Sequence, residues 1–141
     1  MNILFFLTPK AQVRYVGADD TLRQALEKMD HYQYASVPIV DEKTGRYIGT
    51  LTEGDLLRTI KEQYDLSLRK AEDIPLRQIP RKRDYLPITA SANIEDIVQA
   101  AISQNFVPVV DDLGCFIGII TRREVIRFLQ NCTQSDKAGQ V

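Results

Sequence analysis

The sequence predicts an α+β fold in two layers, built from two pseudo-symmetric β-α-β-β-α units that pack through their sheets. Two segments of the chain occur twice, since Val37–Asp41 returns as Val107–Asp111 and Gly45–Thr52 returns as Gly114–Thr121. Both copies are rich in β-branched residues and are flanked by stretches with the apolar spacing of an amphipathic helix. Two copies indicate a packed pair of units rather than a solenoid.

The repeat is also visible position by position. Aligning residues 37–60 with 107–129, and leaving Thr44 unmatched, gives nine identities in 23 pairs. Each unit has roughly 60 residues, too few to bury much surface alone, so we expect either one compact domain or two small subdomains that share a core. Gly49 and Gly118 are single glycines within strands, where we expect another backbone to approach closely.

The first unit begins with the apolar run Ile3–Leu7, which is too short for a signal peptide and is expected to pack on the core. A short strand around Val13–Val16 precedes a helix with apolar residues at i, i+3, i+4 and i+7 from Leu22. Residues 19–21 are expected to cap this helix. The repeated segments then form two strands. The apolar stripe of the closing helix is expected to comprise Leu56, Leu57 and Ile60.

The second unit repeats this order of elements. A short strand around Tyr85–Ile88 precedes a helix with the same apolar spacing from Ile94, opened by Ser91 or Asn93. Two strands follow. The apolar stripe of the closing helix is expected to comprise Val125, Ile126 and Leu129.

These elements give the expected organisation of the chain. The first repeat, with its N-terminal strand or helix, covers residues 1–65, and the second repeat covers residues 84–133. Residues 66–83 form a connector that is apolar enough to pack on the units and is broken by prolines. A flexible polar tail is expected over residues 134–141.

Composition and charge argue against several classes of function. A formal net charge of −1 disfavours a nucleic-acid surface built on bulk positive charge. No P-loop, dinucleotide fingerprint or catalytic constellation occurs, and His31 has no nucleophile motif beside it. Cys115 and Cys132 lack metal-ligand spacing. We therefore expect no enzyme, no catalytic cofactor, no metal site and no membrane span, in a cytoplasmic protein with reduced cysteines.

The doubled motifs together resemble the tandem CBS-domain pair, also called the Bateman module. The resemblance covers about residues 8–131 and rests on the order of the elements, the Val-Pro-hydrophobic-Val-Asp strand, the hydrophobic-Gly-hydrophobic-hydrophobic-Thr strand and the Thr-x-x-Asp that follows. It implies a stand-alone module that forms a homodimer, often a flat disc, and binds adenine nucleotides in clefts between the paired units. The chain is also similar to bacterial sensors of cyclic di-AMP, with AMP, ADP and ATP as competing ligands.

The first candidate site is Thr52-Glu53-Gly54-Asp55, where the second repeated strand meets the closing helix. A helix N-terminus attracts phosphate, and a carboxylate three residues after the threonine can accept both hydroxyls of a ribose. The alternative is a capping box, which needs no ligand and can coexist with one. Given the resemblance, we expect Thr52 and Asp55 to bind a ribose.

The second copy of this turn, Thr121-Arg122-Arg123-Glu124, departs from the pattern. Glu124 is one methylene longer than an aspartate, and Thr-x-x-Glu is a literal capping box. Arg122 and Arg123 suit phosphate because guanidinium groups form paired hydrogen bonds with it, although two solvated arginines are the alternative. We expect Asp55 to hold a ribose while the arginines bind phosphates.

The resemblance places the adenine base against two segments of the first unit and their equivalents in the second. Backbone groups there are expected to read the adenine edge, and Tyr15 or Tyr34 to stack on the ring, unless these aromatics belong to the core. The first-unit residues are Val13, Arg14, Tyr15, Tyr34, Ala35 and Ser36. The second-unit equivalents lie near Leu86–Thr89 and Asn105–Val107. The basic run Arg81–Arg83 either lines a phosphate path or is solvated.

We therefore expect a regulatory module that binds an adenine nucleotide and signals to a partner, such as a regulated enzyme or transporter. The alternative is a ligand-free, dimeric interaction or scaffold protein. That alternative is favoured by the change from Asp55 to Glu124 between the copies and by the acidic Glu53.

Overall fold

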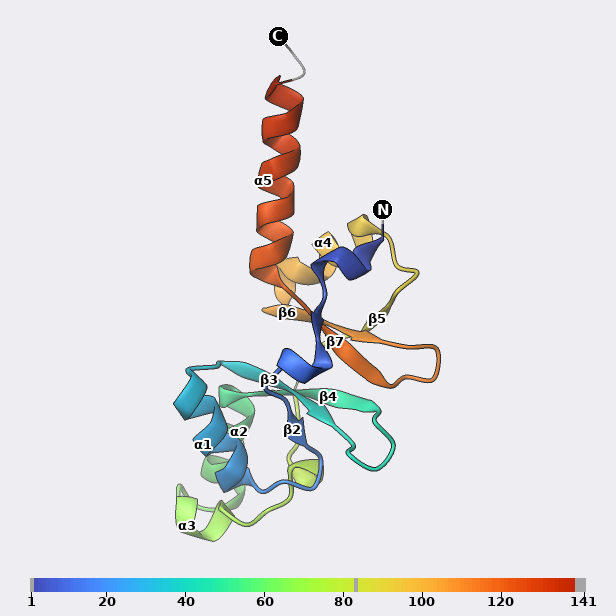
Figure 1. Cartoon of the computed structure of the whole chain (residues 1–141). Coiled ribbons are helices and arrows are strands. Elements are labelled where there is room, and N and C mark those ends of the chain that lie inside the picture. Colours follow the sequence, from blue (N-terminus) through green and yellow to red (C-terminus); the bar gives the residue numbers. More distant parts are fainter. Residues whose placement is uncertain (1, 83, 139–141) are drawn as a thin grey trace. The chain divides into compact units, whose positions relative to one another are not determined.

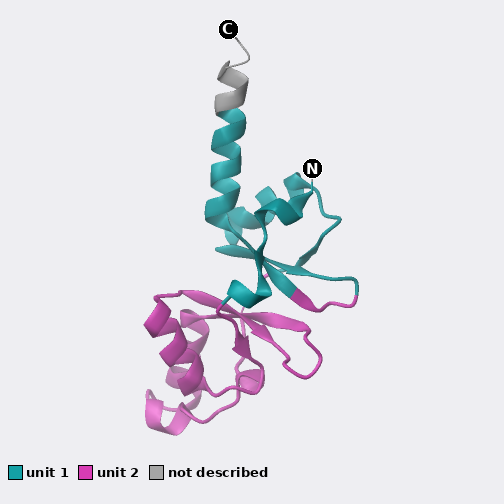
Figure 2. Cartoon of the chain, in the orientation of Figure 1, with its two compact units in different colours: residues 1–13, 86–112, 117–141 teal, residues 14–85, 113–116 magenta. Residues whose placement is uncertain are grey.

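The computed structural model describes residues 2–82 and 84–138, with side chains through Thr133 in the last helix (Figure 1). The α+β fold predicted from the sequence is confirmed, because the helices and two sheets follow one another as two β-α-β-β-α units. The chain forms two compact units, shown in magenta and teal in Figure 2. Unit 2 (magenta) comprises residues 14–85 and 113–116, and unit 1 (teal) comprises residues 1–13, 86–112 and 117–141.

Unit 2 contains a three-stranded sheet in the order β2-β3-β4. Strand β2 (Val16–Gly17) runs parallel to β3 (Ser36–Val40), which pairs antiparallel with β4 (Tyr47–Thr52). Helices α1 (Leu22–Tyr32) and α2 (Glu53–Gln63) pack with this sheet around one hydrophobic core. The sheet and α2 meet at Thr52, so the end of β4 sets the position of the first turn of α2.

Helix α1 forms where the apolar spacing predicts it. Leu22, Ala25 and Met29 are buried in the core of unit 2. Thr21 caps the helix, because its Oγ accepts a hydrogen bond from the Gln24 N–H while the Gln24 side chain accepts one from the Thr21 N–H. This capping box satisfies two donors that a helix N-terminus otherwise leaves unpaired.

Part of the predicted connector folds onto unit 2. Helix α3 (Leu68–Ala71) and the short 3-10 helix η3 (Leu76–Gln78) each bury an apolar side chain in the core of that unit. A backbone hydrogen bond of 2.9 Å from Leu22 N to the carbonyl of Ile74 ties this segment to the start of α1. Arg83, the last residue of the predicted connector, lies outside the described residues.

Unit 1 contains a four-stranded sheet in the order β1-β7-β6-β5. The core of this unit includes Ile3, so the N-terminal apolar run packs as expected. Asn93 caps the first long helix of the unit, in a capping box with Asp96. The elements of this part of the chain are η1 (Ile3–Phe6), β1 (Thr8–Pro9), η2 (Lys10–Gln12), β5 (Ile88–Thr89), α4 (Ile94–Ser103), β6 (Phe106–Val110), β7 (Phe116–Thr121) and α5 (Arg122–Ala138).

The N-terminal segment adds an edge strand to the sheet of unit 1. Strand β1 pairs antiparallel with β7, which places Thr8 opposite Ile119 and Pro9 opposite Gly118. A Cβ at Gly118 would overlap the Thr8 carbonyl and lie 3.1 Å from the Cα of Pro9, so the close backbone approach predicted at this glycine is confirmed. Because of this pairing, the N-terminal segment groups with the second repeat, whereas the sequence analysis placed it with the first.

Gly49, the counterpart in unit 2, has different neighbours. The Asp84 carboxylate and the Arg81 guanidinium occupy the space that a Cβ at Gly49 would need. Asp84 accepts a hydrogen bond of 3.0 Å from Thr50 N, and it forms an ion pair of 2.7 Å with Arg81. Side chains, rather than the backbone we expected, therefore approach this glycine.

The turn before β7 belongs to unit 2 because it pairs with the turn before β4. Phe116 N donates to the Gly45 carbonyl over 2.8 Å, and Tyr47 N donates to the Gly114 carbonyl over 3.1 Å. Gly45 and Gly114 have φ angles of +77° and +82°, in the left-handed region that favours glycine. This pairing gives a structural reason why both copies of the repeat have a glycine at this position, Gly45 in the first and Gly114 in the second.

The short strands differ from the prediction. Strand β2 begins at Val16 rather than Val13, and β5 begins at Ile88 rather than Tyr85. In each strand only two residues pair in parallel with the neighbouring strand before the chain leaves the sheet for its helix. The residues before β2 and β5 that were predicted to be strand, 13–15 and 85–87, lie outside the sheets.

The predicted apolar stripes of the closing helices are partly wrong. Leu56 and Val125 are buried, but Leu57, Ile126 and Leu129 are 62%, 49% and 43% exposed. A helix turns by about 100° per residue, so Leu57 and Ile126, which directly follow buried positions, leave the core face, whereas the exposure of Leu129, four residues after Val125, does not follow from this rotation. These three side chains therefore lie outside the cores of their units.

Helix α5 continues through Ala138, past residue 134 where we expected a flexible tail to begin. Residues 139–141 of that predicted tail lie outside the described residues. Within residues 2–82 and 84–138, no helix combines the length and the hydrophobicity that crossing a bilayer requires.

Candidate functional site

Thr52 and Asp55 form the first turn of α2, as the sequence predicts. Thr52 Oγ accepts a hydrogen bond of 3.1 Å from Asp55 N, and Asp55 Oδ2 accepts one of 3.0 Å from Thr52 N. This is a complete capping box. The ligand-free interpretation of this turn is therefore realised in the structure, and one oxygen of Asp55 remains for other partners.

The second oxygen of Asp55 is also occupied. Arg58 Nη2 donates to Oδ1 over 2.7 Å, and the backbone N–H of Lys82 donates to the same oxygen over 3.4 Å. The Asp55 residue is only 2% exposed, and a buried carboxylate without hydrogen-bond donors would destabilise the fold. A sugar hydroxyl that bonds to Oδ1 of Asp55 therefore competes with Arg58 and the Lys82 backbone for this oxygen.

Arg58 brings positive charge to the first turn of α2. Its Nη1 lies 3.6 Å from the position that a Cβ on Gly54 would take, and its side chain is 38% exposed. The first N–H groups of a helix carry partial positive charge and lack intrahelical partners. At the start of α2, Glu53 N and Asp55 N already donate to the Ala35 carbonyl and to Thr52 Oγ, so the guanidinium and the partial positive charge of the helix end are what suit an anion such as phosphate.

The end of β3 lies beside this turn. Ser36 is opposite Thr52 in the β3–β4 register, and Glu53 N donates to the Ala35 carbonyl over 3.1 Å. The structure therefore brings two of the predicted base-binding residues, Ala35 and Ser36, next to the predicted ribose-binding turn.

Arg14, Tyr32 and Tyr34 stack on one another in a row. The Arg14 guanidinium lies 4.8 Å from the centre of the Tyr32 ring, and the Tyr32 and Tyr34 rings stack with centres 5.8 Å apart. Tyr34 is 38% exposed, so it is not a core aromatic. An exposed aromatic ring can stack on a base. Tyr32 was not among the predicted residues.

Tyr15 and Val13 have partners of a different kind. The Tyr15 ring packs edge-on against Phe116, and its carbonyl accepts a hydrogen bond of 2.8 Å from Lys28 Nζ. That carbonyl is therefore already bonded, although we expected it to read the adenine edge. Val13 groups with unit 1, where its N–H donates to the carbonyl of Lys10 over 3.1 Å.

The second turn, at the start of α5, repeats the first with looser geometry. Thr121 Oγ accepts a hydrogen bond of 3.2 Å from Glu124 N. Glu124 pairs with Arg127 at 3.3 Å, and these side chains are 38% and 57% exposed. Asp55 and Arg58 stand at the equivalent positions of the first repeat and form a shorter, more buried pair.

Arg122 and Arg123 have different environments. Arg122 Nε donates to the carbonyls of Ala101 and Gln104 over 2.8 and 3.1 Å, at the C-terminal end of α4. Cations at a helix C-terminus satisfy its unpaired carbonyls and interact favourably with its dipole. Arg122 is therefore engaged in stabilising α4, whereas Arg123 is exposed.

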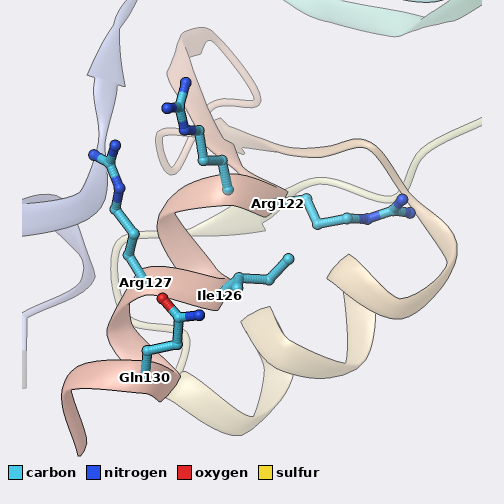
Figure 3. A pocket seen from close by; sticks show the side chains of 5 residues that line it. Arg122, Ile126, Arg127 and Gln130 are labelled. Carbon is cyan, nitrogen blue, oxygen red and sulfur yellow. The ribbon is translucent and has the colours of Figure 1, made fainter.

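An open hollow of about 430 Å³ lies along this part of α5 (Figure 3). Figure 3 shows Arg122 and Arg127 extending from the helix in different directions. The side chains that line the hollow combine cationic groups with one apolar side chain. The lining residues are Arg122, Arg123, Ile126, Arg127 and Gln130.

No metal centre is formed by the part of the chain that the structure describes. In that part, His, Cys, Asp and Glu side chains do not gather in groups of three or more that could hold an ion. The two turns present carboxylate, hydroxyl, guanidinium and backbone groups, which form hydrogen bonds.

Comparison with known families decides where these turns belong. The sequence model of the CBS domain matches residues 7–62 and 72–131. The chain belongs to the CBS-domain family. Each match contains one of the two turns, so Thr52–Asp55 and Thr121–Glu124 occupy the same place in two CBS repeats.

Several CBS proteins are similar to this chain. MJ1225 of Methanocaldococcus jannaschii is 26% identical over 120 residues, which are 77% of this chain and 42% of that protein. The chain thus spans less than half the length of this curated relative. A crystal structure of CbpB in complex with c-di-AMP has a TM-score of 0.85 at 19% identity and covers 100% of this chain and 91% of that one.

CBSX2 in complex with AMP has a TM-score of 0.73 at 23% identity, covering 94% of this chain and 98% of that one. At these identities the likeness to solved structures establishes the fold. This likeness supports the predicted pair of CBS repeats, and it does not identify the ligand of this chain.

The sequence analysis missed Arg58, Arg127 and Lys82 as candidate site residues. Arg58 and Arg127 form one of the nine identities of the repeat, three residues after the acid in each copy, so a signal was present. Lys82 was predicted only as part of the basic run Arg81–Arg83, which either lines a phosphate path or is solvated. Its contact with Asp55 is made by the backbone N–H, which no residue pattern reveals.

Proposed function

We propose that this CBS pair is a regulatory module that binds an adenine nucleotide and passes the change to a partner protein. The observation that carries the proposal is the turn Thr-x-x-acid-x-x-Arg. Thr52, Asp55 and Arg58 form it at the start of α2, and an equivalent turn starts α5. Carboxylate, guanidinium and helix N-terminus together suit the ribose and phosphate of a nucleotide.

In the proposed complex the first turn holds the sugar. Asp55 accepts the ribose hydroxyls, and Thr52 contacts the ligand at the same turn. Ala35 and Ser36 line the site because they adjoin Thr52, and the exposed ring of Tyr34 stacks on the base.

The second turn contributes charge for phosphate. Arg123 and Arg127 are exposed and line the hollow along α5, and Thr121 and Glu124 complete the turn. Arg122 keeps its bonds to the end of α4 and adds positive charge to the hollow.

Cyclic di-AMP, AMP and ATP are the ligands to compare, with ADP beside them. Two observations favour a ligand with more than one phosphate: the turn occurs twice, and three arginines line one hollow. CbpB is described with c-di-AMP and CBSX2 with AMP, which makes these two nucleotides the first to test.

The proposal includes a homodimer without catalytic activity, located in the cytoplasm. Leu57, Ile126 and Leu129 expose apolar side chains on α2 and α5, and such residues are common at protein interfaces. Cys115 and Cys132 form no disulfide in the part of the chain that the structure describes, which fits a reducing compartment.

A thermal-shift panel tests the proposal. A ligand present at about 100 times its dissociation constant stabilises the folded protein by about 2.7 kcal/mol, which raises the melting temperature by several degrees. We expect this rise with at least one of c-di-AMP, AMP, ADP and ATP, and not with the matched guanine nucleotides. If none of the four shifts the melting temperature, the protein is better explained as a ligand-free scaffold.

A further inference from the structure

We propose that Arg58 selects for phosphate at the first turn by exchanging partners. In the ligand-free protein its guanidinium holds Asp55, and in the complex it turns to the phosphate while the ribose takes its place on Asp55. This inference rests on the proposed function and deepens it, because it assigns to Arg58 an exchange between Asp55 and phosphate that the comparisons do not provide.

The exchange follows from how Asp55 is bound. Its carboxylate receives three hydrogen bonds, from Thr52 N, Arg58 Nη2 and Lys82 N, and the residue is 2% exposed. A buried carboxylate that loses a partner without replacement is strongly destabilised. The ribose of AMP or adenosine supplies two hydroxyl donors, and each ribose of 3′,5′-linked c-di-AMP supplies one, so either can replace Arg58 without leaving Asp55 unpaired.

Arg58 has room to make this exchange. Its side chain is 38% exposed, whereas Asp55 is buried, so the arginine is the mobile partner of the pair. Its Nη1 already lies 3.6 Å from the position of a Cβ on Gly54, at the first turn of α2. A small rotation of the guanidinium would therefore bring it to a phosphate bound at that turn, where an arginine forms charge-assisted bonds.

The second repeat gives an internal comparison. Arg127 pairs with Glu124 at 3.3 Å, and both side chains are more than one third exposed. Because that pair is longer and reaches water, Glu124 does not depend on Arg127 as Asp55 depends on Arg58. We therefore expect discrimination between phosphorylated and unphosphorylated ligands to depend more on Arg58 than on Arg127.

Titration calorimetry of the full chain with AMP, c-di-AMP and adenosine tests the inference. Adenosine offers the base and ribose without the phosphate. We expect Arg58→Gln to reduce the preference for AMP or c-di-AMP over adenosine by about 10- to 100-fold, the range expected for losing a hydrogen bond to a charged group. Affinity for adenosine itself should be kept or should rise, because Asp55 no longer has an internal competitor.

Two further variants complete the design. Arg69→Gln changes an exposed arginine of α3 and should leave the preference at its wild-type value. Arg58→Lys keeps a cation beside Asp55, which protects the fold if Arg58→Gln is too unstable, and should reduce the preference because lysine lacks the paired donors of arginine.

The outcomes separate this inference from the proposed function. If the wild-type protein binds none of the three compounds, nor ADP or ATP in the thermal-shift panel, both ideas fail before any variant is made. If the wild-type protein binds them and the Arg58 variants weaken all three by the same factor, Arg58 only supports the fold. In that case the exchange is refuted while nucleotide binding stands.

Discussion

At the scale of single residues, Asp55 combines a structural and a proposed binding role. Its carboxylate completes the cap of α2 and pairs with Arg58, although the residue is almost entirely buried. The ligand-free interpretation and the ribose-binding interpretation of this turn are therefore compatible. Oδ2 holds the turn together, and Oδ1, which Arg58 contacts, would accept the sugar.

Asp55→Ala should affect stability as well as binding. The substitution removes the reciprocal capping bond and the acid that Arg58 contacts, so we expect the free energy of unfolding to fall by about 1–3 kcal/mol. Nucleotide binding at the first turn should be lost. Urea denaturation and ligand titration measure the two effects.

Glu53→Ala is the matched control for this substitution. Glu53 lies in the same turn and is exposed, so its removal should change the free energy of unfolding by less than about 0.5 kcal/mol. An Asp55→Ala protein that binds nucleotide as the wild type does would show that the ribose site lies elsewhere.

At the scale of elements, two equivalent glycines accommodate different neighbours. Gly118 faces the backbone of Thr8 and Pro9 in β1, whereas Gly49 faces the side chains of Arg81 and Asp84. Backbone atoms in a paired strand cannot move without losing the pairing, but the ends of long side chains can. The two glycines are identical in the repeat, but the neighbours of Gly118 are more rigid than those of Gly49.

We expect Gly118→Ala to be the more destabilising of the two substitutions. It should lower the free energy of unfolding by about 1–3 kcal/mol, because a methyl group would overlap the Thr8 carbonyl. Gly49→Ala should cost less, since Arg81 and Asp84 can swing aside. Denaturant unfolding of both variants checks the order, and equal losses would contradict this explanation.

The connector gives an element-scale prediction about pH. Arg77 pairs with Asp19 at 2.9 Å and with Asp41 at 3.0 Å. The Arg77 guanidinium, and after it the Lys43 N–H, hold the pKa of Asp41 below its ordinary value of 3.8. A carboxyl with a lowered pKa in the folded state stabilises the fold above its unfolded pKa and loses that contribution as pH falls.

The melting temperature should therefore fall as the pH drops below about 3.8. In Arg77→Gln the contribution of Asp41 is smaller, so part of this acid-dependent fall should disappear. Melting curves between about pH 6 and pH 2 measure it. If the melting temperature falls equally with pH in the wild type and in Arg77→Gln, Arg77 does not lower the pKa of Asp41.

At the scale of the whole molecule, exposed apolar residues suggest how copies of the chain meet. Leu57 on α2 is 62% exposed, and Ile126 at the equivalent position of α5 is 49% exposed. The sequence analysis placed both in the core. Their exposure at equivalent positions of the two repeats instead supports the proposed homodimer, because an interface would cover them.

Leu57→Glu tests the proposed dimer. We expect the wild-type protein to sediment as a dimer and Leu57→Glu to sediment as a monomer with an unchanged fold, because a charge would be buried in the interface. Leu66→Glu alters a similarly exposed leucine outside α2 and should remain dimeric. A wild-type monomer, or a Leu57→Glu dimer, would contradict the assignment of this face.

The sequence alone determined the repeat, the helices and the position of both turns. These features depend on local spacing, such as the apolar face from Leu22 and the threonine caps, which a linear pattern records. The pattern could not show that Leu57 faces away from the core, because the two neighbouring leucines look alike in sequence.

Only the tertiary structure decided what the candidate residues touch. It placed the Lys82 backbone on Asp55, the Arg122 guanidinium on the end of α4 and the N-terminal strand on β7. Each of these contacts joins residues far apart in the chain, and it depends on how whole elements pack. Local propensity contains no information about such contacts, so the sequence located the two turns and the fold determined their partners.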